Sequence, residues 1–193
     1  MTFLVLLGIV VVAVVWAIAA YNSLVALKNR AEAAWNQIDV QLKRRHDLVP
    51  NLVETVRGAL EYERQTLEAV VAARQKAVDA HSPAASAAAE QGLTQALGKL
   101  FALVENYPDL KANQNVLQLQ EELTNTENLI AFARQHYNDV VGQYDTKRES
   151  FPSNLIANQF AFAPREYFAA PEEERAVPKV SLSGIGGAPK ASA

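Results

Sequence analysis

The chain has 193 residues, of which 50% are hydrophobic, and its formal net charge is −3. This length allows one modest domain, and the small negative charge leaves no basic stripe of the kind that nucleic-acid binding requires. The absence of cysteine excludes a disulfide framework, a thiolate metal site and a lipidated cysteine.

An unbroken apolar run of eighteen residues extends from Phe3 to Ala20. As a helix it would be roughly 27 Å long, which matches the hydrocarbon layer that a spanning helix must cross. Residues 1–20 are therefore predicted to form a transmembrane anchor in a lipid bilayer. A cleaved signal peptide is the alternative, because Ala17-Ile18-Ala19 has the spacing of a cleavage site, but the length of the run and the lack of a preceding Lys or Arg favour the anchor.

Positive residues occur on one side of this run only. None precedes it, and Lys28, Arg30, Lys43, Arg44 and Arg45 follow it. Because positive residues near a span remain in the cytoplasm, the N-terminus is predicted to lie outside and the body inside the cell.

The apolar period is helical from residue 21 to residue 150, and it predicts helices at about 21–45, 48–80, 83–105 and 110–150. A hairpin is expected at Arg44-Arg45-His46-Asp47, because Asp47 is a good N-cap and Pro50 is tolerated only in the first turn of a helix. Nine positions of the last helix alternate steps of three and four as in a heptad seam: Val116, Leu119, Leu123, Thr126, Ile130, Ala133, Tyr137, Val140 and Tyr144. The predicted fold is all-α, with the transmembrane helix continuing into an antiparallel up-and-down four-helix bundle.

After residue 150 the helical period is lost. Residues 151–182 are predicted to be an irregular docking segment, because they hold five aromatic residues that are too large to leave together in water: Phe151, Phe160, Phe162, Tyr167 and Phe168. The segment could fold back on its own bundle, dock on a neighbouring subunit or lie at the membrane interface. Residues 183–193 are rich in Gly, Ala and Ser and are predicted to be a disordered tail.

Two separated stretches resemble the LemA family: residues 44–58, RRHDLVPNLVETVRG, and residues 119–131, LQEELTNTENLIA. Ala133-Arg134, Tyr137-Asn138, Phe151-Pro152 and Tyr167-Phe168 follow in the same order, so the likeness covers about residues 1–182. It implies a bacterial protein of the cytoplasmic (inner) membrane with one span and a long-helix bundle, and it implies no reaction. Ala161 replaces an expected Gly, which makes a turn with positive φ less expected there.

No residue pattern indicates chemistry. His46, His81 and His136 are the only histidines, and none has a second His or Cys at a helical ligand spacing. No nucleophile elbow is present, and Gly184-Ile185-Gly186-Gly187 follows no predicted strand. We therefore expect no catalytic residue, no cofactor and no metal.

Three functions fit these features. The first is a scaffold that self-associates through its bundle and aromatic segment as a homo-oligomer. The second is a monomeric adaptor that presents the charged hairpin tip to a membrane-protein partner, such as a membrane protease or sensor. The third is an enzyme of a type that its sequence does not reveal. The candidate interaction residues are Arg44, Arg45, His46, Asp47, Phe160, Phe162, Tyr167 and Phe168.

Overall fold

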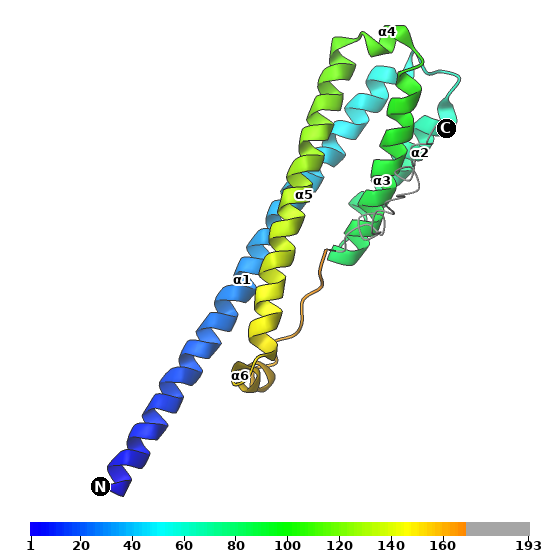
Figure 1. The fold of residues 1–193 in the computed structure, drawn as a ribbon. Coiled ribbons are helices and arrows are strands. Elements are labelled where there is room, and N and C mark those ends of the chain that lie inside the picture. The colour runs from blue at the N-terminus through cyan, green and yellow to red at the C-terminus, as the bar shows by residue number, and fades with distance from the viewer. Residues whose placement is uncertain (169–193) are drawn as a thin grey trace, which may run out of the picture.

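The computed structural model describes residues 1–168, which form six helices and no strand. The helices are α1 (Thr2–Arg57), α2 (Arg64–Val78), α3 (Pro83–Val104), α4 (Pro108–Lys111), α5 (Gln114–Glu149) and α6 (Ser153–Gln159). Figure 1 shows α1 and α5 side by side as a long pair, with the shorter α2 and α3 at the end far from the N-terminus. The all-helical prediction is confirmed for these residues, and the predicted tail at 183–193 lies outside them.

The hairpin predicted at Arg44–Asp47 is wrong, because α1 runs through it as one helix of 56 residues. Asp47 does not cap a new helix; its carboxylate accepts a hydrogen bond from Lys43 one turn earlier, at 3.1 Å. Pro50 lies deep inside α1, where it cannot donate to the carbonyl of His46. Arg74 of α2 replaces the missing donor, since its Nε lies 2.7 Å from the His46 carbonyl oxygen. A tertiary contact thus overrides the local stop signal.

The chain instead turns after Arg57, and α2 begins at Arg64 rather than at residue 48. The third predicted helix starts where expected: Pro83 is its first residue, and Ser82 Oγ accepts a hydrogen bond from the backbone N–H of Ala85. The fourth is shorter than predicted, because Asn113 caps α5 by accepting from the backbone N–H of Asn115 at 2.9 Å.

Three buried clusters follow one another along the molecule. The far cluster joins α1, α2, α3, α4 and α5, the middle one joins α1 and α5, and the near one joins Leu24, Tyr144 and Ala157. Seven of the nine predicted seam positions of α5 are buried, and Leu119 and Ala133 are partly buried. The seam therefore forms the inner face of α5.

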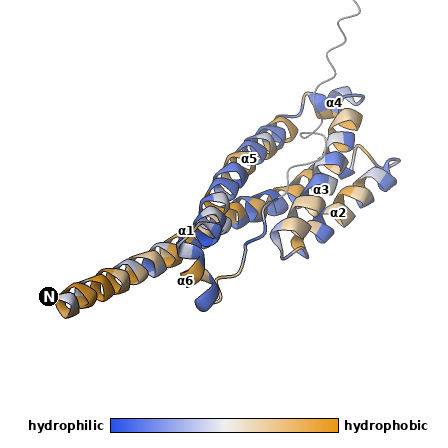
Figure 2. Ribbon diagram, turned by 60° about the horizontal axis from the view of Figure 1, so that its bottom comes forward, coloured by the Kyte–Doolittle hydropathy of each residue, from blue (hydrophilic) through white to orange (hydrophobic). Residues whose placement is uncertain are grey.

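The first third of α1 is almost entirely exposed, because among residues 2–20 only the side chains of Ala17 and Ala20 are partly or fully buried. It projects beyond the other helices, and apolar residues dominate it (Figure 2). Phe3, Val12 and Ile18 are among its exposed side chains. Among residues 1–168, α1 is the one helix that is long and apolar enough to cross a membrane.

The end of α6 corrects a second expectation. Ala161 has a φ of 51°, although a residue with a Cβ disfavours the left-handed region. The backbone N–H of Phe162 donates to the carbonyl of Ala157 at 2.9 Å, and the N–H of Ala161 donates to the carbonyl of Asn158 at 3.3 Å. These two bonds form the Schellman motif that ends a helix with a left-handed residue, and they hold Ala161 in a conformation that Gly would adopt more easily.

We expect Arg74→Met to lower the free energy of unfolding by about 1–3 kcal/mol, because it leaves the His46 carbonyl without a donor. Pro50→Ala restores the backbone N–H, so Arg74→Met should cost clearly less in a Pro50→Ala background. Denaturant unfolding of the full chain in detergent, followed by circular dichroism, measures all four forms of this cycle. Lys76→Met is the control, since Lys76 is exposed two residues farther along α2, and it should change stability by less than about 0.5 kcal/mol. An equal loss from Arg74→Met in both backgrounds would contradict the explanation.

Candidate functional site

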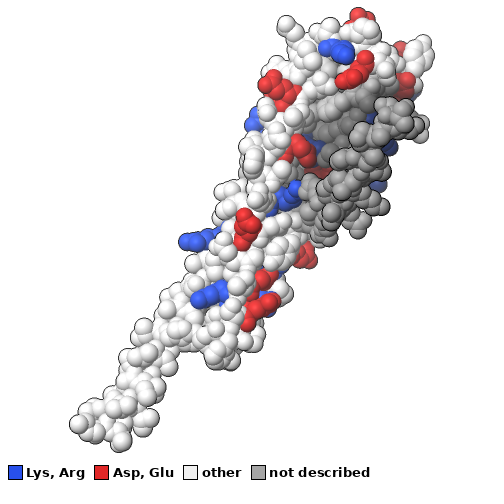
Figure 3. Space-filling model, in the orientation of Figure 1, with Lys and Arg blue, Asp and Glu red and all other residues white. Residues whose placement is uncertain are grey.

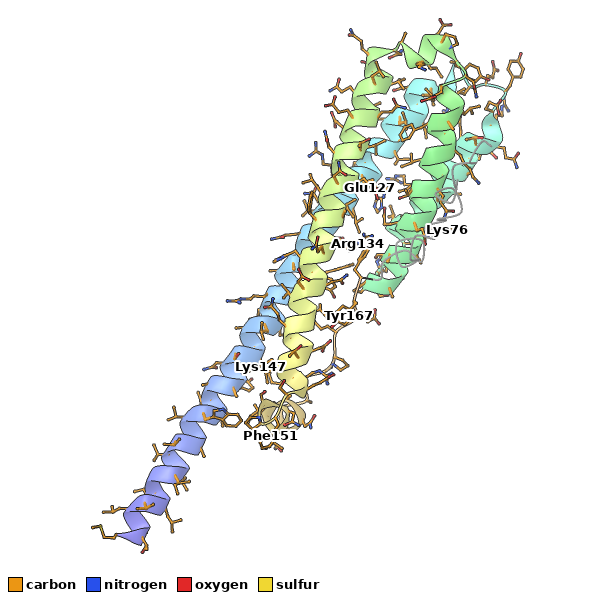
Figure 4. All side chains as sticks on the ribbon, viewed as in Figure 1. Lys76, Glu127, Arg134, Lys147, Phe151 and Tyr167 are labelled. Carbon is orange, nitrogen blue, oxygen red and sulfur yellow. The ribbon has the colours of Figure 1, made fainter. Side chains whose placement is uncertain are left out.

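A buried polar cluster occupies the place where the hairpin tip was predicted. Arg45 and His46 of α1 face Glu90 and Thr94 of α3, and Glu127 reaches them from α5 (Figure 4). Arg45 Nη1 lies 2.9 Å from Glu90 Oε2 and 2.8 Å from Glu127 Oε2, while Arg45 Nη2 donates to Thr94 Oγ1 at 2.8 Å. His46 Nε2 lies 2.5 Å from Glu90 Oε1. We call these five residues the Arg45 cluster.

The Arg45 cluster connects three helices at one level. The side chains of Arg45 and Glu90 are only 4% and 6% exposed, so each charge depends on its partners for the stabilisation that water would otherwise give. Both oxygens of Glu90 are engaged, one by Arg45 and one by His46. The geometry is that of a cross-link which fixes the register of α1, α3 and α5.

The four residues of the predicted hairpin tip therefore do not form one exposed contact surface. Arg45 and His46 are buried, whereas Arg44 and Asp47 remain exposed in the middle of α1. Arg44 lies 3.9 Å from Glu122 of α5 at the surface, and Asp47 pairs with Lys43. The four residues thus lie on a continuous helix and not at a tip.

Sequence reasoning missed Glu90, although a signal existed. Glu90 continues the buried stripe of α3, because Leu93, Leu97 and Leu100 follow it at steps of three and four. An acidic residue at such a position must find a buried partner. Arg45 occupies the equivalent place on α1, between Leu42 and Val49.

No cluster in residues 1–168 suggests a metal site, since no three His, Asp or Glu side chains come together there in a geometry suited to an ion. His81 lines a hollow of about 480 Å³ beside His46 and Asp39. His136 is exposed on α5. The three histidines are therefore not brought together by the fold.

The aromatic segment, as far as residue 168, folds back along its own chain. We call residues 161–168 the strap; it leaves α6 and climbs beside α5 (Figure 1). Phe168 is 3% exposed and packs with Trp35 and Tyr137 in the middle cluster. Phe162 is half-buried against Tyr21, with ring centroids 5.6 Å apart. Phe160 and Tyr167 are more exposed, at 57% and 47%.

Hydrogen bonds from α5 hold the strap. The hydroxyl of Tyr144 donates to the carbonyl of Ala163 at 2.8 Å, and that of Tyr137 donates to the carbonyl of Glu166 at 2.7 Å. The side chain of Asn138 receives the backbone N–H of Phe168 and donates to its carbonyl, both at 2.9 Å. Burial raises the pKa of Tyr137 and of Tyr144 above the ordinary value of 10.0, and Arg165 partly opposes the shift. Both tyrosines therefore keep their proton, and can donate it in a hydrogen bond, to a higher pH than an ordinary tyrosine.

We expect Glu90→Gln to lower the free energy of unfolding by about 3–5 kcal/mol, as is typical when one partner of a buried ion pair is removed. The matched control is Glu122→Gln, which removes the partly exposed partner of Arg44 and should cost less than about 1 kcal/mol. Chemical denaturation of the two variants in parallel compares them. Similar losses would mean that the Arg45 cluster does not stabilise the fold.

The strap should detach at alkaline pH. Because the folded state raises the pKa of Tyr137 and Tyr144, their contribution to stability is complete below roughly pH 10 and is lost as the pH rises through the raised values. In a Trp16→Phe variant, the emission of Trp35 reports this release, since its ring lies 6.1 Å from that of Phe168. A Tyr137→Phe/Tyr144→Phe variant should lack the alkaline step. An identical step in that variant would assign the transition to other groups.

Comparison with known proteins identifies the family. A profile of the LemA family matches residues 34–182. Protein LemA of Metamycoplasma hominis is 28% identical over 158 residues, which are 80% of this chain and 71% of that protein. Magnetosome protein MamQ 1 of Paramagnetospirillum magneticum and Magnetosome protein MamQ of Magnetospirillum gryphiswaldense are 26% and 25% identical over 174 residues. These alignments cover 77% of this chain and 64% of each MamQ protein, just under two thirds of their length. Since the profile covers most of the described body and well over half of the sequence, the chain belongs to the LemA family.

Proposed function

We propose that this protein is a membrane-anchored helical scaffold whose copies associate side by side, and that it catalyses no reaction. The anchor is α1 itself, whose apolar run passes into the body without a break in the helix. A cleavage after Ala19 would cut this helix directly before Ala20, which is already buried. The continuity therefore favours a retained anchor over a signal peptide.

One surface carries the proposal of self-association. Val40 of α1 and Leu129 and Phe132 of α5 are 62%, 45% and 71% exposed. The antiparallel pairing that sets Trp35 against Tyr137, with ring centroids 5.6 Å apart, brings Val40 level with Phe132. Val40 lies about one helical turn from Arg44 on α1, and Leu129 lies about two turns from its ion partner Glu122 on α5. Each therefore lies near the side of its own helix that carries this surface ion pair. We call Val40, Leu129 and Phe132 the outer apolar face.

Exposed apolar residues that lie together mark a surface that binds another protein more often than one that stays in water. A shared bilayer strengthens this tendency, because it confines the copies to two dimensions and raises their effective concentration. The aromatic segment contributes less to association than its composition suggests, because Phe162 and Phe168 are engaged within their own chain. Tyr167 is the strap residue that remains for a neighbouring copy.

We also propose that the body lies in the cytoplasm of a bacterial cell, with the N-terminus on the other side of the inner membrane. Lys28 and Arg30, which follow the apolar run, support this orientation. Protease added to spheroplasts should leave the body intact, whereas protease added to inverted vesicles should remove it. If protease removes the body in spheroplasts and not in inverted vesicles, the orientation is the opposite of the one proposed.

The oligomeric state tests the scaffold. We expect the full-length protein in mild detergent to form oligomers by native mass spectrometry, and Val40→Ser/Phe132→Ser to lower the subunit number while helical content is kept. Leu117→Ser is the matched control, because Leu117 is 49% exposed but lies 15 residues from Phe132 along α5, roughly 22 Å away, and it should leave the assembly unchanged.

Two outcomes would contradict the scaffold. If the wild-type protein is a monomer at all accessible concentrations, the alternative is an adaptor that offers Arg44 and Asp47 to a membrane-protein partner. If both serine variants assemble like the wild type, another surface holds the copies together and the outer apolar face is wrong.

A further inference from the structure

We infer that α6 and the residues around it form a membrane foot: an uncharged, aromatic turn that rests in the headgroup region of the bilayer that α1 crosses. The membrane foot comprises residues 150–164. This inference rests on the proposed anchor, and it assigns a bilayer contact to a part of the chain that lies some 130 residues after the apolar run.

Contacts with α1 fix the height of the membrane foot. The ring of Phe160 lies 4.9 Å from that of Tyr21, and Tyr21 is the first residue after the apolar run. Trp16, which lies within the run, lines the same hollow of about 740 Å³ as Phe151 and Pro152. If Phe3–Ala20 spans the hydrocarbon, Phe151 and Phe160 are thus at the level where the span meets the headgroups.

The membrane foot turns only one side towards its own protein. Ala157 is 1% exposed and packs with Leu24 and Tyr144, and the hydroxyl of Ser153 donates to the carbonyl of Lys147 at 2.7 Å. Phe151 and Leu155 point away from this contact and are 80% and 58% exposed. Small and hydroxyl side chains therefore make the internal contact together with the half-buried Ile156 and Phe162, while Phe151 and Leu155 are left outside.

Charge is absent from the membrane foot. Residues 150–164 contain no Asp, Glu, Lys or Arg, and the charged residues visible in Figure 3 lie above the projecting part of α1 and the end of the body next to it. Lys147, Arg148 and Glu149 precede this uncharged stretch, and Arg165 and Glu166 follow it. An aromatic segment without charge, bounded by charged residues on both sides, suits the interface, where rings gain apolar contact and amide or hydroxyl groups stay hydrated.

The bilayer explains this surface better than a second copy does. An interface with a second copy would have to form at the height of the lipid headgroups. If α1 spans the bilayer, those headgroups already surround α1 on every side that α6 leaves open. The outer apolar face, by contrast, lies about twenty residues farther along α1, roughly 30 Å from the end of the run. The two exposed apolar regions are therefore separate, and the region next to the span is the one that lipid reaches.

Depth-dependent quenching of tryptophan by brominated phospholipids in liposomes tests the inference with the full chain. The foot reporter is Trp16→Phe/Trp35→Phe/Phe151→Trp, and the matched control is Trp16→Phe/Trp35→Phe/Phe132→Trp, whose new indole is similarly exposed but belongs to the outer apolar face. We expect lipids brominated near the headgroup to reduce the emission at position 151 and to leave position 132 unchanged. Circular dichroism of each variant confirms that the fold is kept.

The anchor has its own reporter, because Trp35→Phe leaves Trp16 as the only indole. Quenching of Trp16 without quenching at position 151 would overturn the membrane foot and keep the anchor. Absence of quenching at both positions would overturn the anchor as well. Equal quenching at positions 151 and 132 would mean that the whole body lies on the membrane. If the emission at position 151 is unquenched and blue-shifted, and if it changes with protein concentration, a second copy covers the foot instead of lipid.

Discussion

The unbroken course of α1 is the constraint on which the rest of the structure depends. Every other helix packs on it directly or through α5 and α2, and most of its first third lies outside this packing. The helix continues past Pro50, and Arg74 supplies a donor to the carbonyl that proline leaves free. A helix end near residue 46 would instead have folded the following residues back along the helix rather than extending it.

Two sets of polar contacts hold the other elements against this rod. The Arg45 cluster ties α3 and α5 to α1 through a guanidinium and two carboxylates, while Tyr137, Asn138 and Tyr144 bind the strap by its backbone. Buried polar groups of this kind favour one arrangement, because any shift of register leaves a charge or a donor unpaired. The body therefore has the properties of a rigid spacer, which agrees with a scaffold better than with a site that must move.

Sequence patterns correctly predicted the features that depend on local periodicity and capping. They failed for features that depend on contacts between residues far apart in the chain. The buried seam of α5, the start of α3 at Pro83 and the apolar run could be predicted, because local spacing and caps determine them. The hairpin at Asp47 could not be rejected from the sequence, since the donor that rescues Pro50 comes from Arg74, 24 residues later. The docking of Phe168 was left open for the same reason: its partners Trp35 and Tyr137 are on two other helices. Glu90 could have been recognised as buried from its place in an apolar stripe.

The continuity of α1 can be measured directly, because the chain has no cysteine to interfere with labelling. Lys28 and Arg57 are both exposed on α1, and spin labels at Lys28→Cys and Arg57→Cys give their separation by double electron–electron resonance in liposomes or detergent. One continuous helix predicts a narrow distribution centred at about 44 Å, from 1.5 Å per residue. A hairpin at residues 44–47 would fold residue 57 back alongside the helix and give a distance less than about half of that, which would contradict the account.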